Sequence, residues 1–173
     1  MRIVAGSRKG ARIFAPKGLA TRPTSDRVRE AAFNLIGPVD EADVLDLFAG
    51  SGAMGLEALS RGAASAVFVE SDREAFWTIQ RNVEKLHVTG AAVLQRDALQ
   101  ALATDRRTYD LILCDPPYGY PDRDRLARYL VRALAPAGLL VYETGTRDEP
   151  IVEGLRTRTS RTYGSARLTL FEH

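Results

Sequence analysis

Two patterns of hydrophobic and polar positions alternate along this chain: short apolar runs, and longer segments in which apolar residues recur at helical spacing. Short apolar runs typical of buried strands lie at 44–48, 66–69, 92–95, 109–114 and 139–143. Apolar residues recur at helical spacing in the segments between them, at 53–61, 72–86 and 123–135. Strands that alternate with helices predict a parallel, doubly wound sheet. We therefore expect an α/β, Rossmann-like fold with a mostly parallel sheet.

The two ends of the chain depart from this pattern. Segments 2–6 and 11–15 flank a turn and predict a small β-hairpin, and an amphipathic helix is expected from about Ser25 to Ile36. Near the other end, 151–156 and 166–171 predict two strands that form an antiparallel hairpin at the sheet edge. We therefore expect a basic extension at 1–40 and a ligand-binding body at 41–173.

A glycine-rich turn follows the first strand of the body. Gly50 and Gly52 would let a ligand approach the main chain closely, and the helix that begins at Ala53 offers unpaired N–H groups. With Gly55, and with Glu70 twenty residues after Gly50, the spacing also satisfies the dinucleotide fingerprint. The turn alone therefore predicts a nucleotide-like ligand and leaves NAD open.

Four acidic residues occur in or at the ends of successive strands: Asp46, Glu70, Asp97 and Asp115. Ligands of open α/β sheets bind beyond the carboxyl ends of the strands. S-adenosylmethionine fits these acids, because its ribose hydroxyls can donate to Glu70, its adenine amino group to Asp97, and its cationic groups favour Asp46 and Asp115. The pyrophosphate of a dinucleotide would be repelled. Asp97 and Asp72 could instead cap the helices that follow them.

The motif Asp115-Pro116-Pro117-Tyr118 ends the fourth strand of the body. An exocyclic amino group of a base is a poor nucleophile, because its lone pair is delocalised into the ring. The Asp115 carboxylate and the Pro116 carbonyl could accept both of its N–H bonds, and would bind better as positive charge develops on nitrogen. Pro117 would stiffen the turn, and Tyr118 could stack on a flipped base. The motif therefore predicts methyl transfer to an amino nitrogen.

Charge is spread unevenly along the chain. Residues 1–30 hold eight basic and two acidic side chains, whereas the net charge of the whole chain is only +2. A basic arm favours a polyanionic partner, although a solvated basic tail would look the same. One cysteine and two histidines exclude an internal disulfide and argue against a zinc site, and no apolar run approaches the ~20 residues of a membrane span. We see no signal peptide, and we expect a cytoplasmic monomer without a metal.

Taken together, these motifs resemble the bacterial 16S rRNA guanine-N2 methyltransferase D family, a group of class I S-adenosylmethionine-dependent amino-methyltransferases. The matching segments are 2–6, 22–30, 33–34, 46–52, 55–58, 60–63, 69–72 and the motif at 115–118, where Tyr118 stands at a position that is often Phe in the family. The resemblance implies methylation of N2 of one guanine in small-subunit rRNA, on an assembled or nearly assembled particle.

The resemblance also implies three sets of site residues. Cofactor contacts are expected from Asp46, Phe48, Ala49, Gly50, Ser51, Gly52, Glu70, Ser71, Asp97, Ala98 and Asp115. Contacts with the target guanine are expected from Asp115, Pro116, Pro117 and Tyr118, and contacts with RNA from Arg8, Lys9, Arg12, Arg22, Thr24, Arg27 and Arg29.

Several other functions remain alternatives. A DNA adenine-N6 or cytosine-N4 methyltransferase would share both motifs, but the short segment at 119–125 leaves no room for a target-recognition insert. A protein-glutamine methyltransferase more often carries Asn-Pro-Pro-Tyr, and an NAD-dependent reductase is disfavoured by Asp46 and Asp115. A non-catalytic RNA-binding module would explain the basic arm but not the acids or the Asp-Pro-Pro-Tyr motif.

Overall fold

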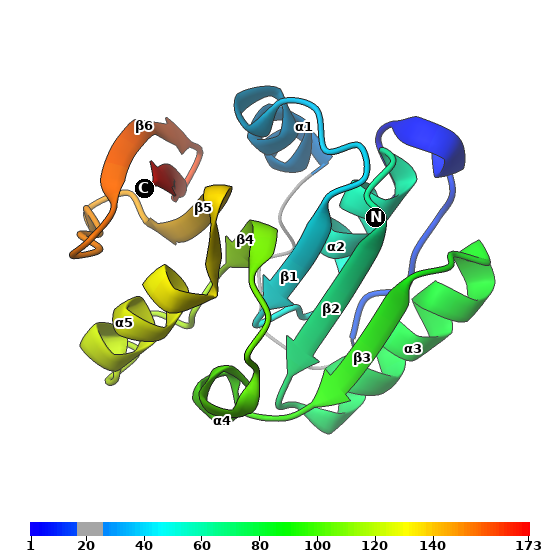
Figure 1. The fold of residues 1–173 in the computed structure, drawn as a ribbon. Coiled ribbons are helices and arrows are strands. Elements are labelled where there is room, and N and C mark those ends of the chain that lie inside the picture. The colour runs from blue at the N-terminus through cyan, green and yellow to red at the C-terminus, as the bar shows by residue number, and fades with distance from the viewer. Residues whose placement is uncertain (17–25) are drawn as a thin grey trace.

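The computed structural model describes residues 1–16 and 26–173, which form a seven-stranded sheet with helices on both faces (Figure 1). The strands are β1 (Asp43–Leu47), β2 (Ser65–Glu70), β3 (Ala91–Gln95), β4 (Tyr109–Cys114), β5 (Leu134–Gly145), β6 (Arg156–Tyr163) and β7 (Ala166–Glu172). The helices are α1 (Asp26–Ile36), α2 (Ala53–Ser60), α3 (Arg73–Leu86), α4 (Ala98–Thr104) and α5 (Arg123–Ala133).

The strand order is β3-β2-β1-β4-β5-β7-β6. Strands β1 to β5 pair in parallel, and β7 pairs antiparallel with both β5 and β6. The chain moves from β1 toward β3 and then returns to the other side of β1, so the switch point lies between β1 and β4. This topology confirms the predicted α/β methyltransferase-like fold with a C-terminal antiparallel hairpin.

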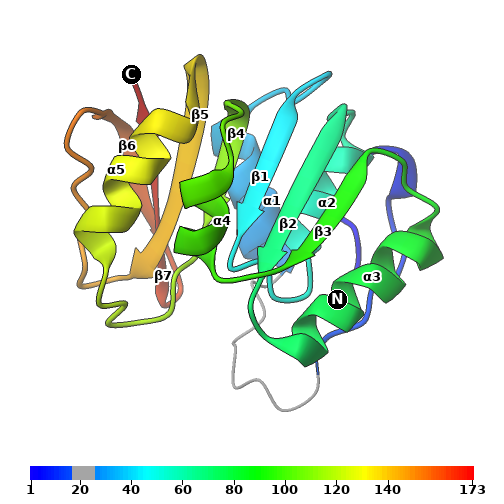
Figure 2. The ribbon, with the colours of Figure 1, turned by 60° about the horizontal axis from the view of Figure 1, so that its bottom comes forward.

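Alternation along the strands divides the core into two layers (Figures 1 and 2). Val44 faces a core cluster that includes side chains of α1, α2 and α3, whereas Leu45 faces the cluster under α4 and α5. In the part of the chain that the structure describes, no helix combines the length and apolar character needed to cross a bilayer.

Residues 1–16 differ from the predicted β-hairpin. They form one isolated antiparallel bridge, between Arg2 and Arg12, and a short 3₁₀ turn at Gly6–Arg8. Gly6 has a φ of +79°, and a Cβ at this position would lie 1.8 Å from the carbonyl oxygen of Ser60 at the end of α2. The chain therefore packs too tightly on α2 to continue as a regular strand.

A buried carboxylate in α2 fastens this N-terminal segment to the sheet layer. Glu57 is fully buried and accepts hydrogen bonds from the backbone N–H groups of Val4 and Ala5, at 2.8 and 2.9 Å. Its other contacts are with Nε of Arg61 at 2.8 Å and Nε of Arg29 at 3.5 Å. Residues from the N-terminus, α1 and α2 therefore share one buried polar cluster.

Arg29 is part of this buried cluster, and the prediction that it contacts RNA is wrong. Its side chain is fully buried and also lies 2.9 Å from the carboxylate of Asp26, and it donates a hydrogen bond to the carbonyl of Arg2. A guanidinium held inside the protein by Glu57 and Asp26 cannot reach a phosphate. The helical pattern of α1 could not reveal that this charge faces inward.

The C-terminal part of the sheet also corrects two boundaries. β5 begins at Leu134, so Pro136 and Gly138 lie within it, where the register against β4 shifts between Tyr109 and Leu111. Such an irregularity accommodates a proline that cannot join the ladder. Residues 151–155 form a turn rather than a strand, because Val152 is anchored in the core and Leu155 donates back to its carbonyl at 3.0 Å.

We predict that Glu57→Ala lowers the free energy of unfolding by about 3–5 kcal/mol, because the buried guanidinium of Arg29 loses its carboxylate partner. Urea denaturation would measure this change. The matched control is Glu30→Ala, which removes an exposed carboxylate from α1 and should change stability by less than about 0.5 kcal/mol. Equal stabilities of the two variants would show that the buried cluster does not hold the N-terminal segment.

Candidate functional site

The turn after β1 has an unusual backbone. Phe48, Gly50 and Gly52 all have positive φ, at 59°, 57° and 76°. For Phe48 this conformation is uncommon, and its ring packs edge-on against that of Tyr120 with 5.3 Å between the centroids. Gly52 donates to the carbonyl of Ala49 at 2.7 Å, and α2 begins at the next residue. The sequence-predicted strand, turn and helix are therefore joined by a tight reversal.

Glu70 lies directly against this turn. One carboxylate oxygen accepts from the N–H of Gly50 and the other from the N–H of Asp72, both at 2.8 Å. Apart from the neighbours Ala49 and Ser51, no atom of the described residues lies within 4 Å of the position where a Cβ of Gly50 would be. The exposed Ser71 follows Glu70. The structure thus brings together the glycine turn and the acid that follows it by twenty residues.

Asp46 is buried beneath the turn, with 4% of its surface exposed, and accepts a hydrogen bond from the N–H of Gly55 at 2.9 Å. Burial, with the nearby charges of Asp115 and Glu70, raises the pKa of Asp46 to about 8, although the Gly55 hydrogen bond opposes this shift. Asp46 therefore retains a proton near neutral pH, and it also fixes the first turn of α2.

Asp115 follows β4 at the same edge of the sheet. The residue is exposed, yet enough protein surrounds its carboxyl group that desolvation raises its pKa to about 6. Pro116 is buried, and Pro117 and Tyr118 are exposed. Tyr118 is 79% exposed, and its ring lies over Gly145, where a Cβ would be 3.1 Å from Cε1 of the ring. The motif thus presents an aromatic face to solvent.

Glu143 is an acid of this site that the sequence analysis missed. It follows Tyr142 in β5, which pairs with Cys114, so Glu143 lies in register beside Asp115. Burial, together with the charge of Asp115, raises the pKa of Glu143 to about 8. The sequence placed it at the end of the predicted strand 139–143, but β5 continues to Gly145, and the register of β5 against β4 is what brings Glu143 to the site.

The acids around the switch point also share one face of the sheet. In each of their strands, the residue two positions earlier packs in the core layer of α1, α2 and α3. Because side chains alternate along a strand, residues two positions apart point to the same face, so four acids point to this layer. These are Asp46, Glu70, Asp115 and Glu143.

Asp97 has the capping role that the sequence allowed. Its carboxylate accepts from the N–H of Gln100 at 3.1 Å at the start of α4, and Ala98 behind it is buried. Asp72 likewise caps α3, accepting from the N–H of Ala75 at 2.8 Å. Within residues 1–16 and 26–173, no donor binds the other carboxylate oxygen of Asp97, and the predicted adenine contact stays a prediction.

Asn82 is a second residue that the sequence analysis missed. This fully buried side chain of α3 donates to the carbonyl of Ser51 at 2.9 Å and to that of Phe14 at 3.0 Å. Its oxygen accepts from the N–H of Phe14 at 2.7 Å. One amide therefore connects the glycine turn to the N-terminal segment. Its only sequence signal was a polar residue on the apolar side of an amphipathic helix.

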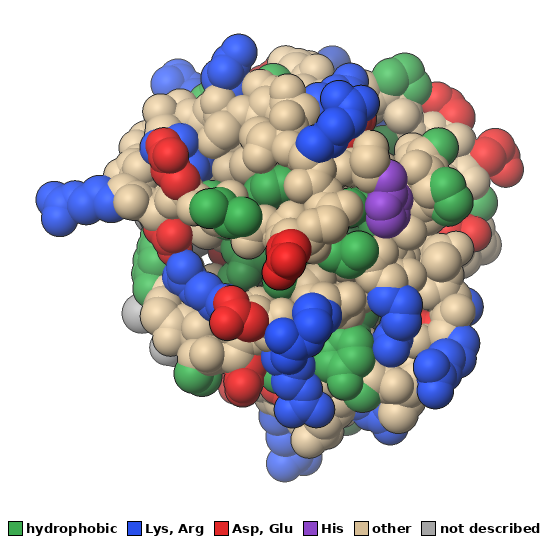
Figure 3. All heavy atoms as spheres, turned by 60° about the vertical axis from the view of Figure 1, so that its left-hand side comes forward, with side chains coloured by type: hydrophobic (Ala, Val, Ile, Leu, Met, Phe, Trp, Pro, Cys, Tyr) green, Lys and Arg blue, Asp and Glu red, His purple; other side chains and the backbone are tan. Residues whose placement is uncertain are grey.

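The predicted RNA-binding residues separate into groups. Arg8 donates to the carbonyls of Leu86 and His87 at 2.8 and 3.2 Å, which places its guanidinium at the end of α3. Lys9, Arg12 and Arg27 are exposed, whereas Arg22 and Thr24 lie outside the described residues. Basic side chains also occur far from the N-terminus, over the side of the molecule that carries α5 and β6 (Figure 3).

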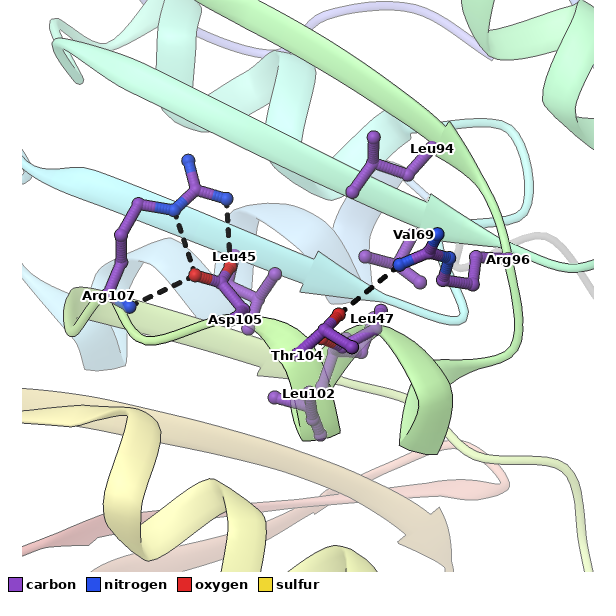
Figure 4. Close-up of a pocket in the computed structure, with 10 residues that line it drawn as sticks. Leu45, Leu47, Val69, Leu94, Arg96, Leu102, Thr104, Asp105 and Arg107 are labelled. Atoms are coloured by element: carbon purple, nitrogen blue, oxygen red, sulfur yellow. Dashed lines mark hydrogen bonds and ion pairs between the residues drawn. The ribbon is translucent and has the colours of Figure 1, made fainter.

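A separate cavity of about 240 Å³ lies on the opposite face of the sheet, between β1–β3 and α4 (Figure 4). Its floor is apolar, with Leu45 and Val69, and arginines stand at its rim. Arg107 is paired with Asp105 at 2.8 Å, and the cavity contains none of the predicted site residues. It is therefore distinct from the acidic edge.

The chain matches the model of the family described as Conserved hypothetical protein 95 over residues 1–172. "Putative rRNA methyltransferase YlbH" of Bacillus subtilis strain 168 is 45% identical over 123 residues, which cover 68% of this chain and 67% of that protein. "Ribosomal RNA small subunit methyltransferase D" of Escherichia coli K12 is 41% identical over 119 residues, which cover 68% of this chain and 60% of that protein.

The solved structure "Putative methyltransferase yhhF from Escherichia coli" is similar along the whole chain. It has a TM-score of 0.89 and 33% sequence identity, and the match covers 100% of this chain and 97% of that one. The family match and the relatives agree with the motifs at 46–52 and 115–118. The protein therefore belongs to the Conserved hypothetical protein 95 family and is a relative of the ribosomal RNA small subunit methyltransferase D proteins, as its sequence motifs predict.

Proposed function

We propose that this protein transfers a methyl group from S-adenosylmethionine to the exocyclic N2 of a guanine in 16S rRNA of the small ribosomal subunit. The observation that carries the proposal is the gathering of Asp46, Glu70, Asp115 and Glu143 on one face of the sheet, beside the exposed ring of Tyr118. The relative named as a small-subunit methyltransferase supports the substrate.

The residues around the glycine turn fit the proposed cofactor. Glu70 is held by two backbone N–H groups at the turn, where it can accept from the ribose hydroxyls, and Gly50 leaves room for a close approach. Asp97 offers an acceptor for the adenine amino group, and Asp46 lowers the energy of a cation above the turn. When bound, S-adenosylmethionine supplies a methyl group carried on a positively charged sulfur.

The Asp-Pro-Pro-Tyr motif would hold the target amino group. The Asp115 carboxylate and the Pro116 carbonyl accept its two N–H bonds, and Tyr118 stacks on the base. Both acceptors bind the nitrogen more strongly as its positive charge grows, which favours the transition state over the ground state. Methylation leaves that nitrogen with one proton too many, and the neighbouring carboxyl groups of Asp115 and Glu143 can accept it.

The wider assignment completes the proposal. Residues 1–40 act as a basic extension that binds RNA, with Lys9, Arg12 and Arg27 as exposed phosphate contacts and Arg22 and Thr24 as further candidates. The protein works as a monomer in the cytoplasm, where small ribosomal subunits assemble. Because the chain is small, the folded surface of the small ribosomal subunit supplies part of the recognition of the target guanine.

The proposal predicts transfer of labelled methyl from S-adenosylmethionine to small subunits from cells that lack the enzyme, with label on N2 of a guanine. Naked rRNA and DNA are the comparison substrates. Asp115→Asn, which keeps the size but loses the charge, should reduce transfer at least about a hundredfold, while thermal unfolding shows that the fold is retained. Label on DNA alone, or full activity of the Asp115 variant, would overturn the proposal.

The raised pKa values of Asp46, Asp115 and Glu143 predict pH-dependent cofactor binding. In the free protein near pH 6, Asp46 and Glu143 hold protons and Asp115 is about half protonated, and a cation above them favours the ionised form of all three. S-adenosylmethionine should therefore bind more tightly as the pH rises from about 6 to about 8.5, by up to about tenfold per pH unit for each proton released.

The control ligand is S-adenosylhomocysteine, whose sulfur is neutral and whose affinity should rise less with pH. Isothermal titration calorimetry in buffers of different ionisation enthalpy would count the released protons. Asp46→Asn should flatten the dependence. The folded protein binds the Asp46 proton more tightly than the unfolded chain, in which the pKa is the ordinary 3.8. The apo-protein should therefore lose stability as the pH rises from about 4 to about 8, and Asp46→Asn should remove this loss. If the ratio of the affinities for S-adenosylmethionine and S-adenosylhomocysteine were the same at about pH 6 and at about pH 8.5, this account would be contradicted.

A further inference from the structure

A hollow of about 520 Å³ opens beside Tyr118, next to the turn that follows β5. Its volume lies within the roughly 300–1,000 Å³ typical of small-ligand sites. The walls come from the start of α5 and from the turn that follows β5. They include Arg123, Gly145, Thr146, Arg147 and Asp148.

The turn after β5 is held in place from several directions. Asp148 donates its N–H to the carbonyl of Gly145 at 3.0 Å, and its own carbonyl accepts from the hydroxyl of Thr144 at 2.9 Å. Arg167 of β7 donates to the carbonyl of Thr146 at 2.9 Å. The backbone on both sides of Arg147 is therefore fixed before any ligand arrives, which lowers the entropic cost of binding.

The charges around this turn are mostly paired. Arg123 is paired with Asp148, and Arg167 lies 3.3 Å from the carboxylate of Glu149. Arg147 is exposed, and within residues 1–16 and 26–173 no hydrogen bond or ion pair joins its guanidinium. The turn therefore presents one available cation to the hollow, next to an aromatic ring that is 79% exposed.

We propose that Arg147 binds a phosphate of the RNA strand adjacent to the target guanine while Tyr118 stacks on the base, so that the hollow is the seat of the flipped nucleotide. A planar guanidinium matches two phosphate oxygens, and an aromatic face accepts a base without reading its sequence. This inference rests on the proposed function. It adds a phosphate contact outside the N-terminal extension.

The test compares three variants on small subunits that lack the modification. Arg147→Gln should raise KM roughly two- to fivefold and leave kcat within about a factor of two, because an exposed contact affects binding more than chemistry. The slope of log affinity against log salt should become less steep by about 0.7–1. Arg147→Lys keeps the charge and should restore most of that slope.

The matched control is Arg106→Gln. Arg106 is also exposed but precedes the amino end of β4, at the opposite edge of the sheet, so KM and salt slope should equal those of the wild type. Affinity for S-adenosylmethionine, measured by calorimetry, should be the same in every variant.

The outcomes separate the inference from the proposed function. If the wild type methylates small subunits and Arg147→Gln matches the Arg106→Gln control, the phosphate contact is overturned and the function stands. Weaker cofactor binding by Arg147→Gln, or a loss of kcat at unchanged KM and salt slope, also overturns it. A wild type that methylates no subunit RNA overturns the proposed function, and the inference with it.

Discussion

Repulsion among carboxyl groups gathered at one edge of a parallel sheet is the constraint on which this site depends. Side-chain alternation places Asp46, Asp115 and Glu143 in the same layer, and burial makes their simultaneous ionisation costly. The free protein tolerates the cluster because protons are retained and because backbone N–H groups bind Asp46 and Glu70. A cationic ligand relieves the same repulsion. The unfavourable electrostatic energy of these carboxyl groups in the free protein therefore favours binding of a cation such as S-adenosylmethionine.

The N-terminal segment is structurally connected to that edge. Asn82 joins the carbonyl of Ser51 in the glycine turn to the backbone of Phe14, and Glu57 joins α2 to Val4 and Ala5. The N-terminal segment, predicted to be a basic extension, thus packs on α2 and α3, which both contact the glycine turn. If the N-terminal segment contacts RNA, the contact would therefore act on α2 and α3, which hold the glycine turn.

Much of the site could be predicted because it depends on local sequence. The strand, glycine turn and helix at 43–60 and the cap at Asp72 follow from periodicity and capping rules that act within a few residues. Arg29 and Glu143 could not be placed in this way. Whether a helical arginine faces water or a buried carboxylate depends on Glu57, which lies 28 residues later in the sequence, and Glu143 joins the site only through the register of β5 against β4.

The exposure of Tyr118 sets the manner of recognition. Tyr118 is 79% exposed and its ring lies over Gly145, so among the described residues its outer face is available to a base. In the described residues, the connection from β5 to β6 contains no helix and no insert separates the Asp-Pro-Pro-Tyr motif from α5, so these two segments offer little chain to wrap around a substrate. Under the proposed function, specificity for one nucleotide then comes from contacts that the rest of the protein surface makes with the substrate, outside the hollow beside Tyr118. Under the proposed function, a small enzyme of this kind would act on a folded ribonucleoprotein, whose shape presents one base, rather than on a flexible strand on which every base is equivalent.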